Sequence, residues 1–345
     1  MKFEILDPRT DPEPAGWARF RAKARLHPVW GYELMRLEAW LARNPPVLVT
    51  ATADGAIVAA MSVLVCRPRL SPRFAPLPGR PLLRPFWAEV YQPWLSGYPG
   101  VAFSPDVPAG DRRELLRRFE RHLRFRLGPG LLGVLYRALG EEFAALAAGP
   151  GRLIKAVDTT AILENTFTTE EDWIASLDVN RRSSMRRHTR KLRDDPTLVV
   201  RGGPGRTDLD IVTITHLVNH HRTRFGKAKL DTRTPPAPAY FESFVRRPDV
   251  HTLTYHDDQG TLLGVNTMLD HPDSPALQHW AALTPEEGGR RQIYFDSYLR
   301  GVRYMTQRGA KELSAGRGMG ELKLNLGFRP RQLHVAVVPR PVLGR

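Results

Sequence analysis

The sequence predicts an α/β (α+β) protein in which one structural unit occurs twice. Two seventeen-residue stretches, Leu48–Leu64 and Leu253–Leu269, each place β-prone residues on both sides of a polar turn. A helical pattern precedes each stretch, and further helical and strand patterns follow each. The same order of elements in both halves indicates a duplicated unit.

The two stretches read as antiparallel hairpins, LVTATADGAIVAAMSVL and LTYHDDQGTLLGVNTML. Their turns are centred on Gly55 and Gly260, and glycine suits the backbone conformations of tight hairpin turns. The offset between the copies is 205 residues both at Leu48 and Leu253 and at the two glycines. We therefore align the hairpins residue by residue with this offset.

A helix is expected before each hairpin. In WGYELMRLEAWLARN one stripe carries three leucines, Leu34, Leu37 and Leu41. In TDLDIVTITHLVNHHRTRF the residue that caps the helix is Thr207 or Asp208, and one face carries Leu209, Val212 and His216. After the hairpins come DRRELLRRFERHLRF and GLLGVLYRAL in the first half, and IYFDSYLRGVRYMTQRG and KELSAG in the second.

The 345 residues, 42% of them hydrophobic, are enough for two domains of ordinary size. We place the junction near GRLIKAVDTTAILENTF, with an N-terminal domain over residues 1–155 and a C-terminal domain over residues 156–345. Between Arg67 and Pro108 the chain is rich in proline and aromatic residues. We interpret this stretch as a surface loop with irregular strand; the alternative is an acceptor-binding lip formed by Trp87, Tyr91, Trp94 and Tyr98.

The chain is strongly basic, with 51 Lys+Arg against 36 Asp+Glu, a net charge of +15. Such a charge creates a positive field that attracts polyanions. Two interpretations stay open, an anionic partner and a generally basic surface.

Several features favour a cytoplasmic protein. The single cysteine, Cys66, lies in an apolar run, has no partner for an internal disulfide and is expected in the core. The N-terminal residues carry charges and prolines rather than the apolar segment of a signal peptide. The apolar runs are shorter than the ~20 residues that span a bilayer, so we expect no membrane span.

The stretch RRSSMRRHTRKLR, residues 181–193, carries seven Lys or Arg residues. Thr168 and Glu171 form a T-x-x-E capping box that begins a helix. Helical phase places Arg181 on an apolar stripe with Ile174, Leu177, Met185, His188 and Leu192, and places Arg182, Arg186, Arg190 and Arg193 on an outer stripe. The outer stripe either is solvated or faces a polyanion, and Arg181 needs either a structural ion pair or a phosphate.

Near the end of the chain, KELSAGRGMGELKLNLGF predicts a short strand ending at Leu313, followed by a loop with Lys323, Gly327 and Phe328. Together with SLDVNRRSSMRRHTRKLR, HHRTRFGKAKL and IYFDSYLRGVRYMTQRGAKELSAG, this ending resembles the second half of the Fem-like (FemAB-type) branch of the GNAT acyltransferase superfamily. The resemblance covers residues 168–335, and covers the first half only through the hairpin repeat. Its most specific element is S-A-G…G-E-x-K-L-x-x-G-F.

The resemblance implies tandem GNAT-like domains, each with a mixed, mostly antiparallel sheet flanked by helices. It also implies an aminoacyl-tRNA donor, an amine acceptor and amide-bond formation without a metal or other cofactor. Lys323 would stabilise the oxyanion or leaving group, and Asp296 would orient Lys323 or accept a proton, a role for which His279 is the alternative. Substrate-binding candidates are Phe328, Trp280, Arg317 and Tyr298; the arginines Arg181, Arg182, Arg186, Arg190 and Arg193 would bind phosphates of tRNA.

The donor could instead be an acyl-CoA. GNAT acetyltransferases hold the CoA pyrophosphate on a loop of the form Q/R-x-x-G-x-G/A before a helix. Here that place reads TPEEGGRRQIYF, in which Gly288 and Gly289 are adjacent, although Arg290 and Arg291 keep it basic. The altered loop and the net charge favour aminoacyl-tRNA over acyl-CoA.

Two other classes of function are considered. HLVNH, with His216 and His220, has the spacing of zinc-protease histidines but lacks the glutamate and a third ligand, so no metal site is expected. A non-enzymatic nucleic-acid-binding protein would need a reading module, and none is recognised. The acceptor, which is a peptidoglycan precursor, a peptide or a secondary-metabolite amine, is left open, as is the oligomeric state.

Overall fold

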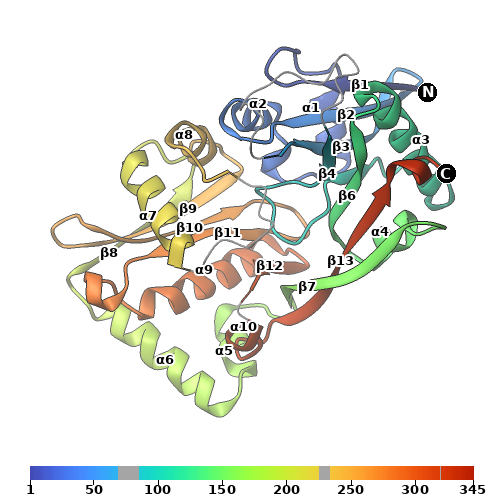
Figure 1. Cartoon of the computed structure of the whole chain (residues 1–345). Helices are drawn as coiled ribbons and strands as arrows, with labels where there is room; N and C mark the ends of the chain where they lie inside the picture. Colours follow the sequence, from blue (N-terminus) through green and yellow to red (C-terminus); the bar gives the residue numbers. More distant parts are fainter. Residues whose placement is uncertain (69–84, 225–233, 319) are drawn as a thin grey trace. The chain divides into compact units, whose positions relative to one another are not determined.

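The computed structural model describes residues 1–68, 85–224, 234–318 and 320–345. The chain forms two compact units (Figure 1). The first comprises Met1–Thr159 and Gln332–Arg345, and the second comprises Thr160–Asp231 and Pro235–Arg331. We expected two domains, residues 1–155 and 156–345. Whether these parts of the chain fold separately is not decided by the two compact units, so this division stays a prediction.

The first unit contains strands β1 (Lys2–Leu6), β2 (Pro46–Ala53), β3 (Ala56–Cys66), β4 (Phe86–Val90), β5 (Val101–Phe103) and β6 (Leu131–Leu139), and most of β13 (Arg329–Pro339). Its helices are α1 (Trp17–Lys23), α2 (Tyr32–Leu41), α3 (Ala109–Leu127) and α4 (Glu141–Ala147), with 3₁₀ turns η1 (Pro28–Trp30) and η3 (Arg340–Val342). The strand order is β1-β2-β3-β4-β6-β13, and β5 pairs with β3. The pair β4–β6 is parallel, whereas β1–β2, β2–β3, β3–β4 and β13–β6 are antiparallel.

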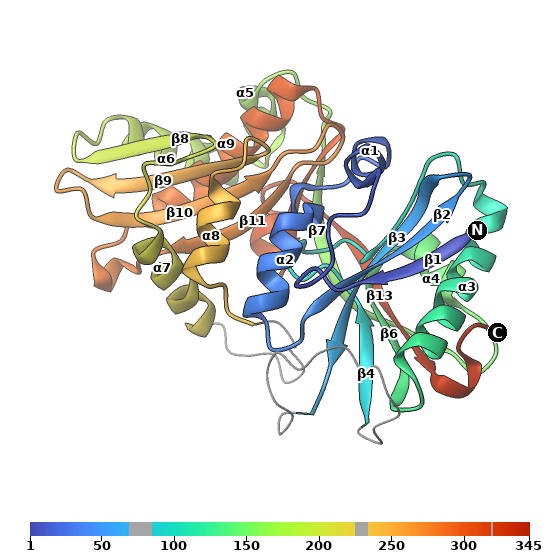
Figure 2. The same cartoon turned by 90° about the horizontal axis from the view of Figure 1, so that it is seen from above.

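Strand β7 (Leu153–Glu164) belongs to the first unit up to Thr159 and to the second unit from Thr160. The second unit also contains strands β8 (Leu198–Pro204), β9 (Val250–Asp257), β10 (Leu262–Leu269), β11 (Ala276–Ala282) and β12 (Glu312–Arg317). Its helices are α5 (Glu170–Ser176), α6 (Val179–Arg193), α7 (Ile211–Arg224), α8 (Pro238–Val245), α9 (Gln292–Arg308) and α10 (Gly320–Leu324), with a 3₁₀ turn η2 (Pro285–Glu287). The strand order is β8-β9-β10-β11-β12-β7. Helices α7 and α8 cover one face of this sheet, and α9 and α6 cover the other (Figure 2).

The two units have the same plan, which confirms the predicted fold class. Each has a mixed, mostly antiparallel sheet, with one parallel pair, flanked by helices. Both predicted hairpins are present, as β2–β3 and β9–β10. The described helices of the chain include none that is both long enough and apolar enough to cross a membrane.

The alignment of the hairpins needs a correction of one residue. In the first unit Val49 pairs with Met61, and both side chains lie in the core beneath α3. In the second unit Leu253 pairs with Asn266, and both lie on the α9 face. The predicted offset of 205 therefore holds for β3 and β10, but β2 and β9 are offset by 204. A one-residue slip exchanges the two faces of a strand, so Leu48 and Leu253 are not equivalent.

The last strand of the first sheet comes from the C-terminal end of the chain, and strand β7 is divided between the two units. Residues Thr160–Glu164 of β7 belong to the second unit and pair antiparallel with β12. Strand β13 follows β12 in sequence, but its residues His334–Pro339 pair with β6 of the first unit. The sequence patterns within the first half do not predict the addition of β13 to its sheet.

Three helix starts differ from the sequence expectations. The capping box of α5 is Thr169 with Asp172, one residue later than predicted, because Asp172 accepts the Thr169 amide at 2.9 Å. The helix then stops, and Asp178 caps α6 by accepting the amide of Arg181. Asp210, not Thr207 or Asp208, caps α7. On α7 the expected face is wrong as well, since Val212 and His216 are exposed.

The aromatic lip is not formed. Tyr91 and Trp94 are buried in the first unit, and the indole N–H of Trp94 donates to the Glu38 carboxylate at 2.6 Å. The indole N–H of Trp87 donates to Glu89 at 2.9 Å. Tyr91 and Trp94 therefore belong to the packed interior, whereas Trp87 and Tyr98 are half-buried. Residues 69–84 of the same stretch lie outside the described residues.

Candidate functional site

The parallel strand pair of the second unit is open. Among its described residues, β11 and β12 share one register pair, Ala276 with Ser314, although β11 continues to Ala282. The equivalent pair of the first unit, β4–β6, is joined at four register positions from Phe86 to Val90. A β-bulge at Gln278–His279, opposite Thr267, bends β11 where the strands part. In the described part of the second unit, β11 and β12 thus part beyond their pair at Ala276 and Ser314, and the end of β12 lacks pairing with β11.

Lys323 lies at this end of β12. Its ammonium group is buried and donates to three carbonyl oxygens at the end of β12: Ala315 at 2.7 Å, and Gly316 and Arg317 at 3.3 Å each. Strand β12 extends to Arg317, beyond the predicted end at Leu313. Lys323 therefore supplies donors to carbonyl groups that a neighbouring strand would otherwise satisfy.

Three of the four substrate-binding candidates belong to one row of aromatic rings on the α9 face. Ring centroids are 5.3 Å apart between Trp280 and Tyr294, 5.1 Å between Tyr294 and Tyr298, and 5.5 Å between Tyr298 and Phe328. Burial, followed by the nearby Tyr294, raises the pKa of Tyr298 above the ordinary range of tyrosine. Both hydroxyl groups therefore stay protonated and bond each other at 3.1 Å. Sequence reasoning did not single out Tyr294, although its spacing of four from Tyr298 on α9 was a usable signal.

Asp296 is held on the inner side of α9. Its Oδ2 accepts the hydroxyl of Tyr255 at 2.9 Å and the Nε of Arg300 at 2.6 Å. Burial, followed by the Asp296 charge, raises the pKa of Tyr255 far above its usual value, so this hydroxyl remains a donor. Asp296 is thus an oriented carboxylate. The sequence missed Tyr255 and Arg300; the i,i+4 spacing of Asp296 and Arg300 was the available signal for the second.

His279 is not brought next to Asp296. Its ring packs edge-to-face against Phe241 and Phe244 of α8, with centroids 5.0 and 5.4 Å apart. Trp280, the next residue, contacts Tyr294 of α9 on the other face of the sheet. His279 therefore lies on the α8 face and Asp296 on the α9 face, which makes Asp296 the better placed of the two candidate bases for chemistry on the α9 side.

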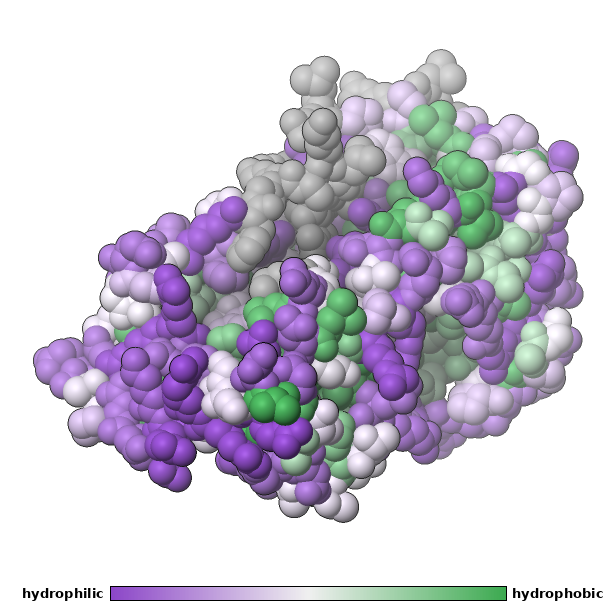
Figure 3. Space-filling model, turned by 90° about the horizontal axis from the view of Figure 1, so that it is seen from below, coloured by the Kyte–Doolittle hydropathy of each residue, from purple (hydrophilic) through white to green (hydrophobic). Residues whose placement is uncertain are grey.

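The arginines of α6 fall into two groups. Arg181 is half-buried, and its guanidinium lies 5.9 Å from the ring centroid of Phe295 on α9, while His188 stacks on the same ring at 4.8 Å. Arg182 is also half-buried and donates to the Leu177 carbonyl at 3.0 Å, so it does not belong to the outer stripe. The other three candidates, Arg186, Arg190 and Arg193, are exposed, as is Arg187. Arg186 pairs with Glu171, and Arg193 contacts Asp194. The surface over α6 is mostly hydrophilic (Figure 3).

Three backbone amides of the loop before α9 are bonded within the loop. The N–H groups of Glu287 and Gly289 both donate to the Thr284 carbonyl, and that of Gly288 donates to Pro285. A Cβ at Gly289 would lie 2.0 Å from the Leu283 carbonyl oxygen, so the loop depends on this glycine to fold back on itself. Of the two arginines expected to keep the loop basic, Arg290 pairs with Asp195 and bonds the Thr197 hydroxyl at 2.8 Å.

Glu287 of the same loop is an ionised carboxylate that is paired with Arg224. The backbone amide of Thr284, followed by contacts from His220 and Arg224, lowers the pKa of Glu287 to about 2. The His220 ring lies 2.9 Å from Glu287 and is stacked on His216, so the HLVNH histidines are joined to this loop. In the described part of the chain no three His, Cys, Asp or Glu side chains are grouped as metal ligands.

Comparisons with known proteins give structural but no sequence matches. No family model and no curated protein sequence matches the chain. L-PGS from Bacillus licheniformis aligns with a TM-score of 0.60 at 10% identity, covering 97% of this chain and 98% of that one. FemX aligns with a TM-score of 0.59 at 10% identity, covering 99% and 98%.

A third structure is the C-terminal domain (DUF2156) of a protein provisionally assigned as a lysylphosphatidylglycerol synthetase from Agrobacterium fabrum. It aligns with a TM-score of 0.57 at 10% identity over 93% of this chain and 90% of that one. The expected resemblance to Fem-type proteins is thereby confirmed at the level of the fold, over nearly the whole chain rather than the second half alone.

Proposed function

We propose that this protein is an aminoacyltransferase that moves an aminoacyl group from aminoacyl-tRNA to an amine and so forms an amide bond. One observation carries the choice of donor, namely the loop before α9, whose backbone amides are bonded within the loop. A CoA pyrophosphate needs free N–H groups in the loop that leads into the helix, and here the N–H groups of Glu287, Gly288 and Gly289 donate inside the loop.

The basic face of α6 supports the tRNA donor. Arg186, Arg190 and Arg193 are exposed on the same unit as the open sheet edge. Arg181, whose guanidinium lies 5.9 Å from the ring centroid of Phe295, is suited to bind a single phosphate of the donor. Resemblance to the Fem-like branch, whose members use aminoacyl-tRNA, supports the same choice.

The chemistry assigns one role to each candidate residue. The acceptor amine attacks the ester carbonyl of the donor, the C–N bond forms, and the C–O bond to the tRNA ribose breaks. Asp296 accepts the proton that the amine loses, and the leaving ribose oxygen takes up a proton. Lys323 stabilises the tetrahedral oxyanion by exchanging one of its two 3.3 Å carbonyl contacts for the developing charge. Trp280, Tyr298, Phe328 and Arg317 surround the transferred group.

The acceptor is an amine of a peptidoglycan precursor, a peptide or a secondary-metabolite intermediate. Purified protein incubated with a mixture of charged tRNAs, or with a mixture of acyl-CoAs, together with such amines tests the donor. We expect deacylation of tRNA that depends on the amine, and no release of CoA. Consumption of acyl-CoA with intact aminoacyl-tRNA would instead establish the alternative, an acyl-CoA-dependent N-acyltransferase.

A matched pair of variants tests the role of α6. Arg186→Gln, Arg190→Gln and Arg193→Gln together should weaken tRNA binding and reduce the slope of log affinity against log salt by about 1 per lost phosphate contact. The control neutralises three arginines of α3 in the first unit, Arg118, Arg124 and Arg126, and changes net charge equally. Equal loss of affinity in both variants would mean that binding reflects net charge alone. Binding of tRNA without turnover of either donor would favour a non-enzymatic nucleic-acid-binding protein.

A further inference from the structure

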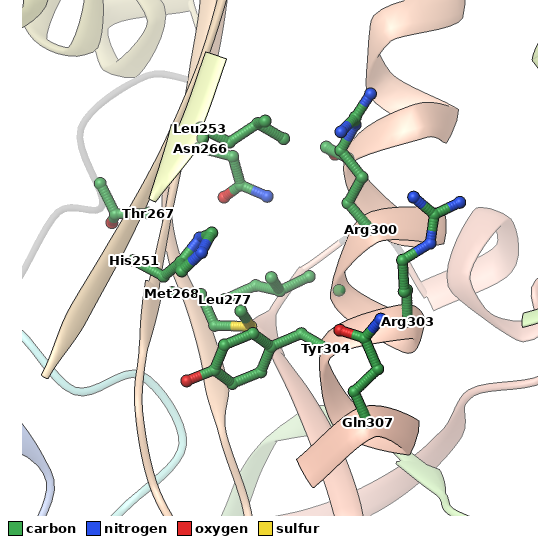
Figure 4. A pocket seen from close by; sticks show the side chains of 13 residues that line it. His251, Leu253, Asn266, Thr267, Met268, Leu277, Arg300, Arg303, Tyr304 and Gln307 are labelled. Carbon is green, nitrogen blue, oxygen red and sulfur yellow. The ribbon is translucent and has the colours of Figure 1, made fainter. Parts of the chain in front are cut away.

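A small pocket lies beneath α9, and one of its lining residues, Arg300, bonds the Asp296 carboxylate assigned to acyl transfer. It has a volume of about 190 Å³, and its walls come from β8, β9, β10 and β11 on one side and from α9 on the other (Figure 4). This volume is below the roughly 300–1,000 Å³ of sites for drug-sized molecules, so a ligand must be small. Leu253, Met268 and Leu277 form an apolar part of the wall.

Asn266 of β10 is directed into this pocket (Figure 4). It is 5% exposed, and its Oδ1 has no hydrogen-bond partner among the described residues. Leaving a buried polar atom without a partner costs about 1–3 kcal/mol. An unsatisfied carbonyl oxygen at the wall of a cavity therefore indicates a ligand that donates an N–H or O–H group.

The first unit provides an internal comparison for this position. With the offset of 205 residues along the second hairpin strand, Asn266 corresponds to Met61. Met61 is fully buried and packs in the hydrophobic core beneath α3. The fold therefore accepts an apolar side chain here, and the polar residue with its cavity is a specific feature of the second unit.

The charged groups that line the pocket are basic. Arg300 and Arg303 contribute guanidinium groups, and none of the described lining residues carries a carboxylate. Arg300 uses its Nε for Asp296, whereas Arg303 uses its Nε and a terminal amino group for Glu170. Burial, followed by the charge of Arg308, lowers the pKa of the lining residue His251, which is therefore neutral at pH 7. The lining thus favours an anionic group placed near Arg300.

We propose that this pocket binds a free aliphatic amino acid. Its carboxylate would lie at Arg300, its amino group would donate to Oδ1 of Asn266, and its side chain would contact Leu253, Met268 and Leu277. The proposal goes beyond the acyl-transfer function and is tested without tRNA or acceptor. The amino-acid-binding proposal and the proposed acyl-transfer function can therefore fail independently of each other.

The experiment measures binding to the full chain. Alanine, valine, leucine, isoleucine and methionine are each titrated by calorimetry and by the shift in Tm. For the best of them, the matched amine without the carboxylate and the matched acid without the amine are then compared. We expect each analogue to bind at least tenfold more weakly. Absence of binding by all five amino acids at millimolar concentration would overturn the proposal, and so would equal affinity of the analogues.

Variants of Asn266 separate a binding site from a packing defect. Asn266→Met, the residue of the first unit, should raise Tm without ligand because it fills the cavity, and should abolish the ligand-dependent shift. Asn266→Leu serves as a second variant if the methionine does not fit. Arg300→Gln should weaken binding tenfold or more, whereas Arg303→Gln, whose guanidinium is turned to Glu170, should bind within threefold of the unmodified protein. Full binding by a folded Asn266→Met protein would show that the pocket is not the site.

Discussion

The ammonium nitrogen of Lys323 lies 2.7 Å from the carbonyl oxygen of Ala315, at the point where β12 has separated from β11. The lysine thus both satisfies the exposed end of β12 and places a positive charge at the open edge. A substitution of Lys323 is therefore expected to change both the stability of the second unit and the rate of acyl transfer. The two effects are separable by measurement.

Lys323→Met should abolish acyl transfer and destabilise the second unit. Loss of the ammonium removes oxyanion stabilisation, for which a 10²–10³-fold fall in kcat is typical, and leaves buried carbonyls unsatisfied at about 1–3 kcal/mol each. Turnover at saturating donor and urea unfolding measure the two effects. Lys323→Arg keeps the charge and should recover stability more fully than activity. Transfer at the normal rate by Lys323→Met would exclude the oxyanion role.

Asp296→Asn tests the proton acceptor. An amide in place of the carboxylate cannot take the amine proton, and we expect kcat to fall by about 10²–10⁴ with tRNA affinity unchanged. The matched control is Tyr255→Phe, which removes one hydrogen bond to Oδ2 and keeps the carboxylate and Arg300. It should lower kcat less than tenfold. Similar losses in the two variants would indicate that Asp296 only supports the packing of α9.

The loop before α9 should show an acid-dependent contribution to stability. The pKa of Glu287 is about 2 in the folded chain and 4.5 ordinarily, so its contribution is present above pH 4.5 and is lost as pH falls toward 2. Glu287→Gln should therefore be less stable than the unmodified protein at pH 7, with the difference vanishing near pH 2. Unfolding free energies from pH 2 to 7 test this, with exposed Glu33→Gln as the control. A difference independent of pH would contradict the prediction.

Local patterns in the sequence predicted the elements and the duplication, because hairpin and helix periodicity are properties of neighbouring residues. They also predicted that Arg181 lies on the apolar side of its helix, and in the structure its guanidinium lies next to the ring of Phe295. The patterns did not predict which of several nearby residues caps a helix. Capping by Asp210 rather than Asp208 shifts the buried face of α7, and the break at Asp178 separates α5 from α6. Each competing residue type can cap a helix, and tertiary packing selects among them.

Contacts between distant segments were beyond the sequence. Nothing local marks that residues 332–345 complete the first sheet, or that Tyr255 bonds Asp296 forty-one residues away. The β-bulge at Gln278–His279 puts Leu277 and Trp280 on the α9 face and His279 on the α8 face, an arrangement that strict alternation along β11 does not predict. Thus the sequence supplied candidate residues, whereas their grouping depended on tertiary structure.

The C-terminal segment is anchored by a buried charge cluster in the first unit. Glu120 and Arg152 both have 0% exposed side chains and are joined by two hydrogen bonds of 2.6 and 2.8 Å. Glu120 also accepts the backbone amide of Gly344 at 2.8 Å and the hydroxyl of Tyr136 at 2.9 Å. Arg152 donates to the carbonyl of Val342 at 3.2 Å. One carboxylate therefore ties α3, β6 and the chain's last residues together.

Glu120→Gln should cost about 3–5 kcal/mol of unfolding free energy, because it leaves the Arg152 guanidinium buried without its counter-charge. Glu114→Gln on the same helix is the matched control. Glu114 pairs with Arg118 and Arg121 at the surface, and such exposed pairs contribute about 0–1 kcal/mol. Urea unfolding followed by circular dichroism measures both. Equal and small losses in the two variants would mean that water reaches the cluster and that the C-terminal segment is held by its apolar contacts.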